Sequence, residues 1–170
     1  MRTVKKIAFS AMFLALCMVL PIITGGIPQI GNALAPMHLP VFLCGFICGG
    51  SYGALVGLIA PIMRSFIFQA PVIYPTGLAM SFELATYGLM SGLLFKLFPN
   101  NNKYLYLSLF LSMIIGRIVW GISRYIMAGL SGSVFNLSMF LAGAFTQAIP
   151  GIICNIILVP LIVILFKKVK

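Results

Sequence analysis

Six apolar stretches fill most of this chain, and their length constrains its fold more than any other feature. They cover residues 7–24, 39–50, 52–68, 77–98, 104–128 and 137–166. Roughly 20 apolar residues in a helix cross the hydrocarbon core of a bilayer, and a chain with 62% hydrophobic and 7% charged residues is more apolar than soluble domains are. We therefore predict an all-α membrane protein, a compact bundle of six transmembrane helices that uses residues 1–170 as a single domain.

Lysine and arginine at the ends of the spans predict how the bundle is oriented. Basic residues precede the first span, flank the connection between the fourth and fifth, and follow the last: Arg2, Lys5, Lys6, Lys96, Lys103, Lys167, Lys168 and Lys170. The segments 25–38, 69–76 and 129–136 contain no Lys, Arg, Asp or Glu. Because basic residues near span ends stay in the cytoplasm, both termini are predicted to be cytoplasmic and these three segments to lie outside.

The scarcity of acidic residues and histidine excludes several classes of function. The net charge of +10 would suggest a nucleic-acid partner, but eight of the eleven basic residues are explained by topology and the other three lie within spans. We therefore expect no nucleic-acid binding. Glu83 is the one acidic residue and His38 the one histidine, too few for paired carboxylates, a Ser-His-Asp relay or a multi-ligand metal site. No loop ends in Gly-Lys-Ser/Thr, and we expect neither an enzyme nor a bound cofactor or metal.

Small residues recur at helical spacing in several spans. The positions are Gly45, Gly49, Gly53 and Gly57, then Gly88 and Gly92, and on the first span Ala8, Ala11 and Ala15. In lipid, this spacing lets helix backbones approach closely. We interpret the glycines as packing positions within the bundle, and the alanines as a smooth stripe on an otherwise bulky helix. The four cysteines lie in apolar spans and are interpreted as small packing residues.

Charged residues at membrane depth point to a binding site, because each costs about 2.5–3.5 kcal/mol or more and persists mainly where a cavity or partner receives it. Three helix faces carry polar residues: Met80, Glu83 and Tyr87; Arg117, Trp120 and Arg124; and Gln147, Gly151 and Asn155 beside an expected kink at Pro150. Arg64 lies at the outer end of the third span. We predict that the three faces converge on one outward pocket for a small solute with an anionic or strongly accepting group.

Less specific interpretations of these polar residues stay open. Glu83 could simply neutralise Arg117 or Arg64 as a buried ion pair, and Arg124, like Arg64, could instead reach the outer interface. His38 could be an interfacial cap or a pocket residue.

The outer segments offer possible cover for the pocket. Residues 25–40 are mostly apolar and hold three prolines and three glycines, so we predict a long first outer loop that acts as a lid, with an ordinary interfacial loop as the alternative. Asn32 and Tyr74, in outer loops beside prolines, are candidate residues for the pocket roof.

With these features the chain resembles a known family, the substrate-binding S components of energy-coupling factor (ECF) vitamin transporters, in the branch that includes pantothenate-type components. The likeness covers essentially the whole chain and includes the span count, the cytoplasmic termini and the long first outer loop. Its motifs are Ala11-x-x-x-Ala15, Pro36-Met-His-Leu-Pro40, Ala60-Pro-Ile-Met-Arg-Ser65, and Pro75-Thr76 leading into Phe82-Glu-Leu-Ala-Thr-Tyr-Gly88.

The resemblance implies a subunit in the plasma membrane of a prokaryote that captures a vitamin from outside. It then docks on a transmembrane coupling protein powered by two cytosolic ATPases, and docking topples the subunit in the membrane. Docking would use Ala8, Ala11 and Ala15. The substrate site would be formed by the first outer loop and the outer parts of the fourth, fifth and sixth helices.

Two vitamins fit the predicted polar residues. Pantothenate offers a carboxylate to Arg117 or Arg124 and hydroxyl and amide groups to Glu83, Gln147 and Asn155, and we favour it. A B6 vitamer, with hydroxyls and a basic ring nitrogen for Glu83, comes second. Two other classes remain as alternatives: a small proton-coupled secondary carrier that uses Glu83, and a membrane protein of structural role without a ligand.

Overall fold

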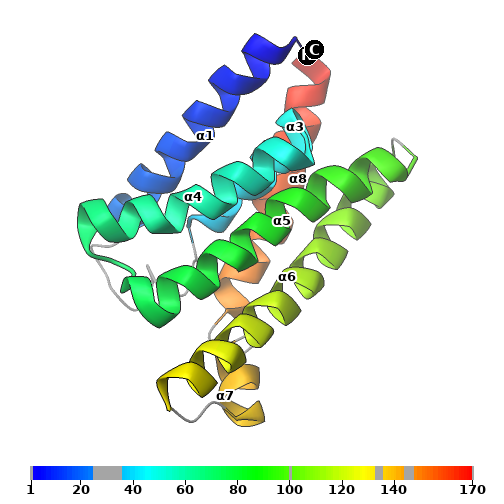
Figure 1. The fold of residues 1–170 in the computed structure, drawn as a ribbon. Coiled ribbons are helices and arrows are strands. Elements are labelled where there is room, and N and C mark those ends of the chain that lie inside the picture. The colour runs from blue at the N-terminus through cyan, green and yellow to red at the C-terminus, as the bar shows by residue number, and fades with distance from the viewer. Residues whose placement is uncertain (1, 25–35, 100, 133–135, 144–147, 170) are drawn as a thin grey trace.

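The computed structural model describes residues 2–24, 36–99, 101–132, 136–143 and 148–169, and all regular secondary structure in these ranges is helical (Figure 1). The elements in chain order are α1 (Thr3–Thr24), α3 (His38–Cys48), α4 (Gly50–Phe68), the short π-helical turn η1 (Ile73–Gly77), α5 (Leu78–Leu97), α6 (Asn102–Ser131), α7 (Leu137–Leu141) and α8 (Ile149–Val169). Of the predicted lid, residues 25–40, the part from 25 to 35 lies outside the described residues.

Five of the described helical segments are long and apolar enough to cross a membrane, namely α1, α4, η1 with α5, α6, and α8. The stretch predicted as a second span forms α3, which has 11 residues and is therefore about 16 Å long, roughly half the thickness of the hydrocarbon core. The prediction of a multi-pass helical membrane protein is confirmed at this level.

The prediction for the last span is wrong about where its helix begins. Residues 137–166 do not form one helix, because the short α7 covers Leu137–Leu141 and α8 begins only at Ile149. Pro150 therefore stands in the first turn of α8 rather than at a kink within a longer helix. Proline is tolerated there, since a first-turn N–H has no partner within the helix.

The core of the bundle forms around α3, which packs against α1, α4, α5 and α8. Nearly all of its residues are buried, including Val41, Phe42 and Cys44. A single residue, Gly49, joins α3 to α4 with a φ of 108°, a conformation that favours glycine. The two helices therefore form a tight hairpin against α5.

Most of the predicted glycines pack the hairpin against α5, namely Gly45, Gly53, Gly57, Gly88 and Gly92. The prediction is wrong for Gly49, where a Cβ would meet nothing within 4 Å and the residue serves the turn instead. A Cβ at Gly57 would overlap the backbone carbonyl of Leu84, and a Cβ at Gly88 would overlap the backbone of Gly53. Because glycine has no side chain, the backbones of α4 and α5 come into direct contact. Close packing of this kind is a main source of helix association in lipid.

Replacing Gly88 with alanine should therefore lower the stability of the folded protein. We expect a loss of about 1–3 kcal/mol, because the new methyl group must displace a helix backbone rather than a flexible side chain. Gly129→Ala on α6 is the matched control, since nothing lies within 4 Å of a Cβ there, and a change within about 0.5 kcal/mol is expected. Thermal unfolding in detergent measures both, and equal effects would contradict the packing role.

The beginning of α1 and the end of α8 lie side by side at one end of the bundle (Figure 1), where Phe9 and Phe166 meet edge to face with ring centroids 5.5 Å apart. The inner face of α1 buries Phe13 and Cys17. Its predicted alanine stripe is turned the other way: Ala8, Ala11 and Ala15 are all exposed.

Candidate functional site

Glu83 is at the centre of a buried polar cluster between α3, α5 and α6. Its side chain is 2% exposed, and its Oε1 accepts a hydrogen bond of 2.7 Å from the hydroxyl of Tyr87, one turn further along α5. The Nη1 of Arg117 on α6 lies 2.9 Å from the same oxygen. The predicted alternative of a Glu83–Arg117 ion pair is therefore present, and Arg64 is not the partner.

Two aromatic contacts fix the position of Tyr87. Its ring packs against Phe42 with centroids 4.7 Å apart and lies 5.4 Å from the ring of His38. On the α6 side the ring occupies the space that a side chain at residue 116 would need, because a Cβ at Gly116 would overlap it. The tyrosine is held on three sides, and its hydroxyl is aimed at the Glu83 carboxylate.

His38 joins the cluster from the first turn of α3. Its Nε2 lies 3.8 Å from Oε1 of Glu83, and its side chain is 7% exposed. The first turn of α3 is thereby brought against α5. The structure thus favours the pocket interpretation of His38 over that of an interfacial cap.

A cavity of about 380 Å³ opens beside this cluster, between α6, α7 and α8. Four polar residues line it, and all were predicted in the site: His38, Tyr87, Arg117 and Asn155. Glu83 is not in the lining and lies behind Tyr87 and Arg117. Its contacts with them make it a residue that positions the two side chains facing the cavity.

Two buried polar atoms of the lining residues have no hydrogen-bond partner among the described residues. They are Nε of Arg117, which is a donor, and Oδ1 of Asn155, which is an acceptor. The amide nitrogen of Asn155 instead donates to the carbonyl of Gly151 at 2.7 Å. Because buried polar groups in proteins are nearly always paired, the two free atoms indicate that a ligand or water supplies their partners.

Gly151, on the predicted face of Asn155, also lines the cavity. The remaining lining is apolar and was not predicted: Phe110, Met113, Ile114 and Ile118 on α6, Phe140 on α7, and Ile152 on α8. The α6 residues share the helix face of Arg117 at the spacing i, i+3, i+4, i+7 and i+8, a pattern that could have identified them. Phe140 could not be found that way, because α7 had been merged with the last span.

Other predicted site residues lie elsewhere. Arg64 donates from Nη1 to the carbonyl of Met18 at 3.1 Å and stacks over Phe68, so it ties α4 to α1. Arg124 contacts the hydroxyl of Thr76 at 3.4 Å, above the cavity along α6. Neither arginine lines the cavity.

Tyr74 and Trp120 also lie outside the lining. The Tyr74 hydroxyl donates to the carbonyl of Met127 at 2.8 Å and fastens η1 to α6. Trp120 packs against Phe140, with ring centroids 6.3 Å apart, and so supports one wall from behind. Asn32 and Gln147 lie outside the described residues.

The described residues contain no group of three or more His, Cys, Asp or Glu side chains that could hold a metal ion. The arrangement is that of a small-molecule site, with an apolar chamber and a few polar groups at one end.

Comparison with known proteins agrees with this architecture. The family model described as "ECF transporter, substrate-specific component" matches residues 5–163. No match was found among curated proteins or among solved structures. With the match covering nearly the whole helical bundle, the chain belongs to the family of substrate-specific components of ECF transporters.

Proposed function

We propose that the cavity beside Arg117 binds a water-soluble vitamin or vitamin precursor, with pantothenate as the favoured substrate. Membership of the family makes the chain a substrate-binding subunit of an ECF importer. The observation that supports this site is the pair of partnerless atoms, Arg117 Nε and Asn155 Oδ1, on residues that line a cavity of about 380 Å³. That volume lies in the usual range of small-molecule sites, roughly 300–1,000 Å³.

The chemistry of the lining favours an acid with a compact apolar body. Arg117 offers N–H groups to a carboxylate while Glu83 holds its other edge. Asn155 offers an acceptor to a hydroxyl or amide N–H, and the aliphatic wall of Ile114, Ile118 and Ile152 suits methyl groups. Pantothenate has a carboxylate, hydroxyls, an amide and a dimethyl centre.

A B6 vitamer fits less well. Its basic ring nitrogen was assigned to Glu83, but that carboxylate is bonded to Tyr87 and Arg117 and does not line the cavity. Pyridoxine therefore stays the second candidate.

The same contacts bear on the alternative of a proton-coupled carrier. Such a carrier needs a carboxyl group that gains and loses a proton as the site changes its exposure. Glu83 faces an arginine at 2.9 Å and is buried behind the cavity wall, so its carboxyl group is not placed to exchange protons with the cavity. We infer a positioning role for Glu83.

Reconstitution in liposomes separates the two functions. The purified chain alone should bind pantothenate but accumulate none, with or without an ion gradient. Accumulation should begin when a coupling protein and two cytosolic ATPases of an ECF module are added with ATP. Uptake by the lone chain along an ion gradient would establish the carrier instead.

We further propose that the exposed stripe Ala8, Ala11 and Ala15 docks on the coupling protein, in the plasma membrane of a prokaryote. A face of small side chains lets a second helix approach closely. Ala11→Trp should therefore abolish co-purification with the coupling protein and leave vitamin affinity unchanged.

The matched control for docking is Ile122→Trp, a change to an exposed residue of α6. It should preserve assembly. Loss of assembly in both variants, or in neither, would remove the role assigned to the stripe.

A further inference from the structure

A second, larger cavity lies at the opposite end of the bundle from the vitamin site, where α1 begins and α8 ends. Its volume is about 1050 Å³. The short α3 explains it: the turn at Gly49 and Gly50 packs against Gly92 and Leu93 of α5, and α5 continues past this contact to Leu97. The ends of α1, α5 and α8 therefore surround a recess below α3.

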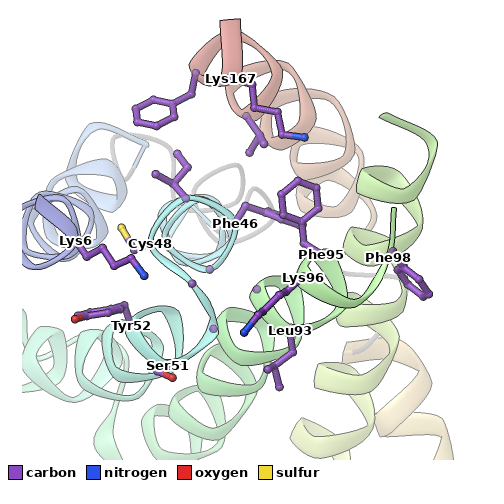
Figure 2. A pocket seen from close by; sticks show the side chains of 17 residues that line it. Lys6, Phe46, Cys48, Ser51, Tyr52, Leu93, Phe95, Lys96, Phe98 and Lys167 are labelled. Carbon is purple, nitrogen blue, oxygen red and sulfur yellow. The ribbon is translucent and has the colours of Figure 1, made fainter. Parts of the chain in front are cut away.

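Three lysines from three helices border this recess. Figure 2 shows Lys6 reaching in from α1, Lys96 from α5 and Lys167 from α8, around the end of α3. Lys6 Nζ lies 5.9 Å from the ring centre of Tyr52, and Lys167 Nζ lies 4.4 Å from that of Phe95. Basic residues are expected at the cytoplasmic ends of spans, but topology alone does not require them to border one cavity.

The chain supplies no carboxylate side chain to this end of the bundle. Its single acidic residue, Glu83, is paired with Arg117. Glu83 also lies 13 residues before Lys96 on the same helix, which is roughly 20 Å along the axis. The sequence thus provides no Asp or Glu side chain beside Lys6 and Lys96 at this end of the bundle.

The walls of the recess are apolar. Phe46, Phe95, Phe98, Val163 and Phe166 line it together with the lysines. A soluble anion would use only the ammonium groups and leave these aromatic walls uncovered. A molecule with an anionic head and hydrocarbon chains would match both parts of the lining.

We propose that this recess binds the phosphate headgroup of an anionic phospholipid from the cytoplasmic leaflet. Lys6 and Lys96 contact the phosphate, and acyl chains lie against the aromatic wall. Basic pockets between transmembrane helices on the cytoplasmic side are suited to such headgroups, and each lysine near the surface strengthens binding about fivefold. The site is separate from the vitamin cavity and does not depend on the identity of the vitamin.

The test measures binding of short-chain phosphatidylglycerol to the purified full-length protein by native mass spectrometry. Phosphatidylglycerol should be retained more strongly than phosphatidylcholine of the same chain length. Lys6→Gln and Lys96→Gln should each weaken its retention about fivefold, and the double variant about 25-fold. Glycerol phosphate, which carries the headgroup charge without chains, should not displace the lipid at equal concentration.

Lys103→Gln is the matched control, because Lys103 is an exposed lysine at the same end of the bundle and does not line the recess. It should leave lipid retention unchanged. A loss equal to that of Lys6→Gln would show a diffuse charge effect and overturn the site, and so would equal retention of both lipids.

Two further results would also overturn the lipid assignment. Displacement by glycerol phosphate would identify a soluble anion as the occupant. Lysine variants that leave lipid retention unchanged but weaken co-purification with a coupling protein would identify an acidic partner surface instead. An unchanged unfolding temperature in each single variant shows that the variants are folded, so the single variants decide the matter even when the double variant is unstable.

Discussion

Replacing Arg117 with methionine should weaken pantothenate binding by about 30-fold or more in the purified chain. Arg117 lines the cavity, and its Nε is buried without a partner, so it is the cation best placed to meet a carboxylate. Removing one partner of a buried, hydrogen-bonded charge pair costs about 2–5 kcal/mol, which corresponds to roughly 30-fold to several thousand-fold in affinity. Isothermal titration with the vitamin measures the loss directly.

Arg124→Met provides the comparison on the same helix. Arg124 contacts Thr76 and does not line the cavity, so a loss of less than about threefold is expected from long-range charge alone. The sequence placed both arginines in the site on equal terms. An equal loss in the two variants would mean that the ligand spans both positions, and would contradict the assignment of the carboxylate to Arg117.

Replacing Arg117 should also have a large effect on the free energy of unfolding. Arg117→Met leaves the Glu83 carboxylate buried without its guanidinium partner, beside the Tyr87 hydroxyl at 2.7 Å and the His38 ring at 3.8 Å. Removing one member of a buried ion pair costs about 3–5 kcal/mol, whereas replacing both members is often close to neutral. We therefore expect the double variant Glu83→Gln with Arg117→Met to recover most of the stability that Arg117→Met loses.

A double-mutant cycle in mixed micelles measures this coupling, with unfolding followed for the two single variants and the double variant. Coupling of several kcal/mol indicates a pair that acts as a unit. Additive effects would contradict it and would assign the stability of the site to packing around Tyr87 instead.

The polar part of the site was predictable because ionisable residues are rare and costly within a membrane. Glu83 and Arg117 stood out in the sequence for that reason, and helical spacing then placed Tyr87 and Asn155 near them. For His38 the sequence supports two interpretations, since its position before an apolar stretch fits either an interface or a pocket. Only the packing of α3 against α5 places its ring beside Glu83.

The rest of the site could not be predicted, because it depends on how each helix is rotated about its axis and on where the helices begin and end. Composition does not encode either property. Arg64 occupies a polar position in an apolar stretch just as Arg117 does, yet its helix turns it towards the carbonyl of Met18. The apolar wall of the cavity could not be separated from lipid-facing residues by hydropathy. In the fold, the end of α7 was missed because residues 137–166 read as one continuous apolar run.

The most direct test of the vitamin site is a thermal-shift screen of the purified chain against water-soluble vitamins, repeated with Ile114→Trp, which fills the cavity from the α6 wall. A tight ligand raises apparent stability by mass action. We predict a rise with pantothenate in the wild-type chain that is lost in the filled variant. No shift with any vitamin, or the same shift in both proteins, would contradict the proposal that this cavity captures the substrate.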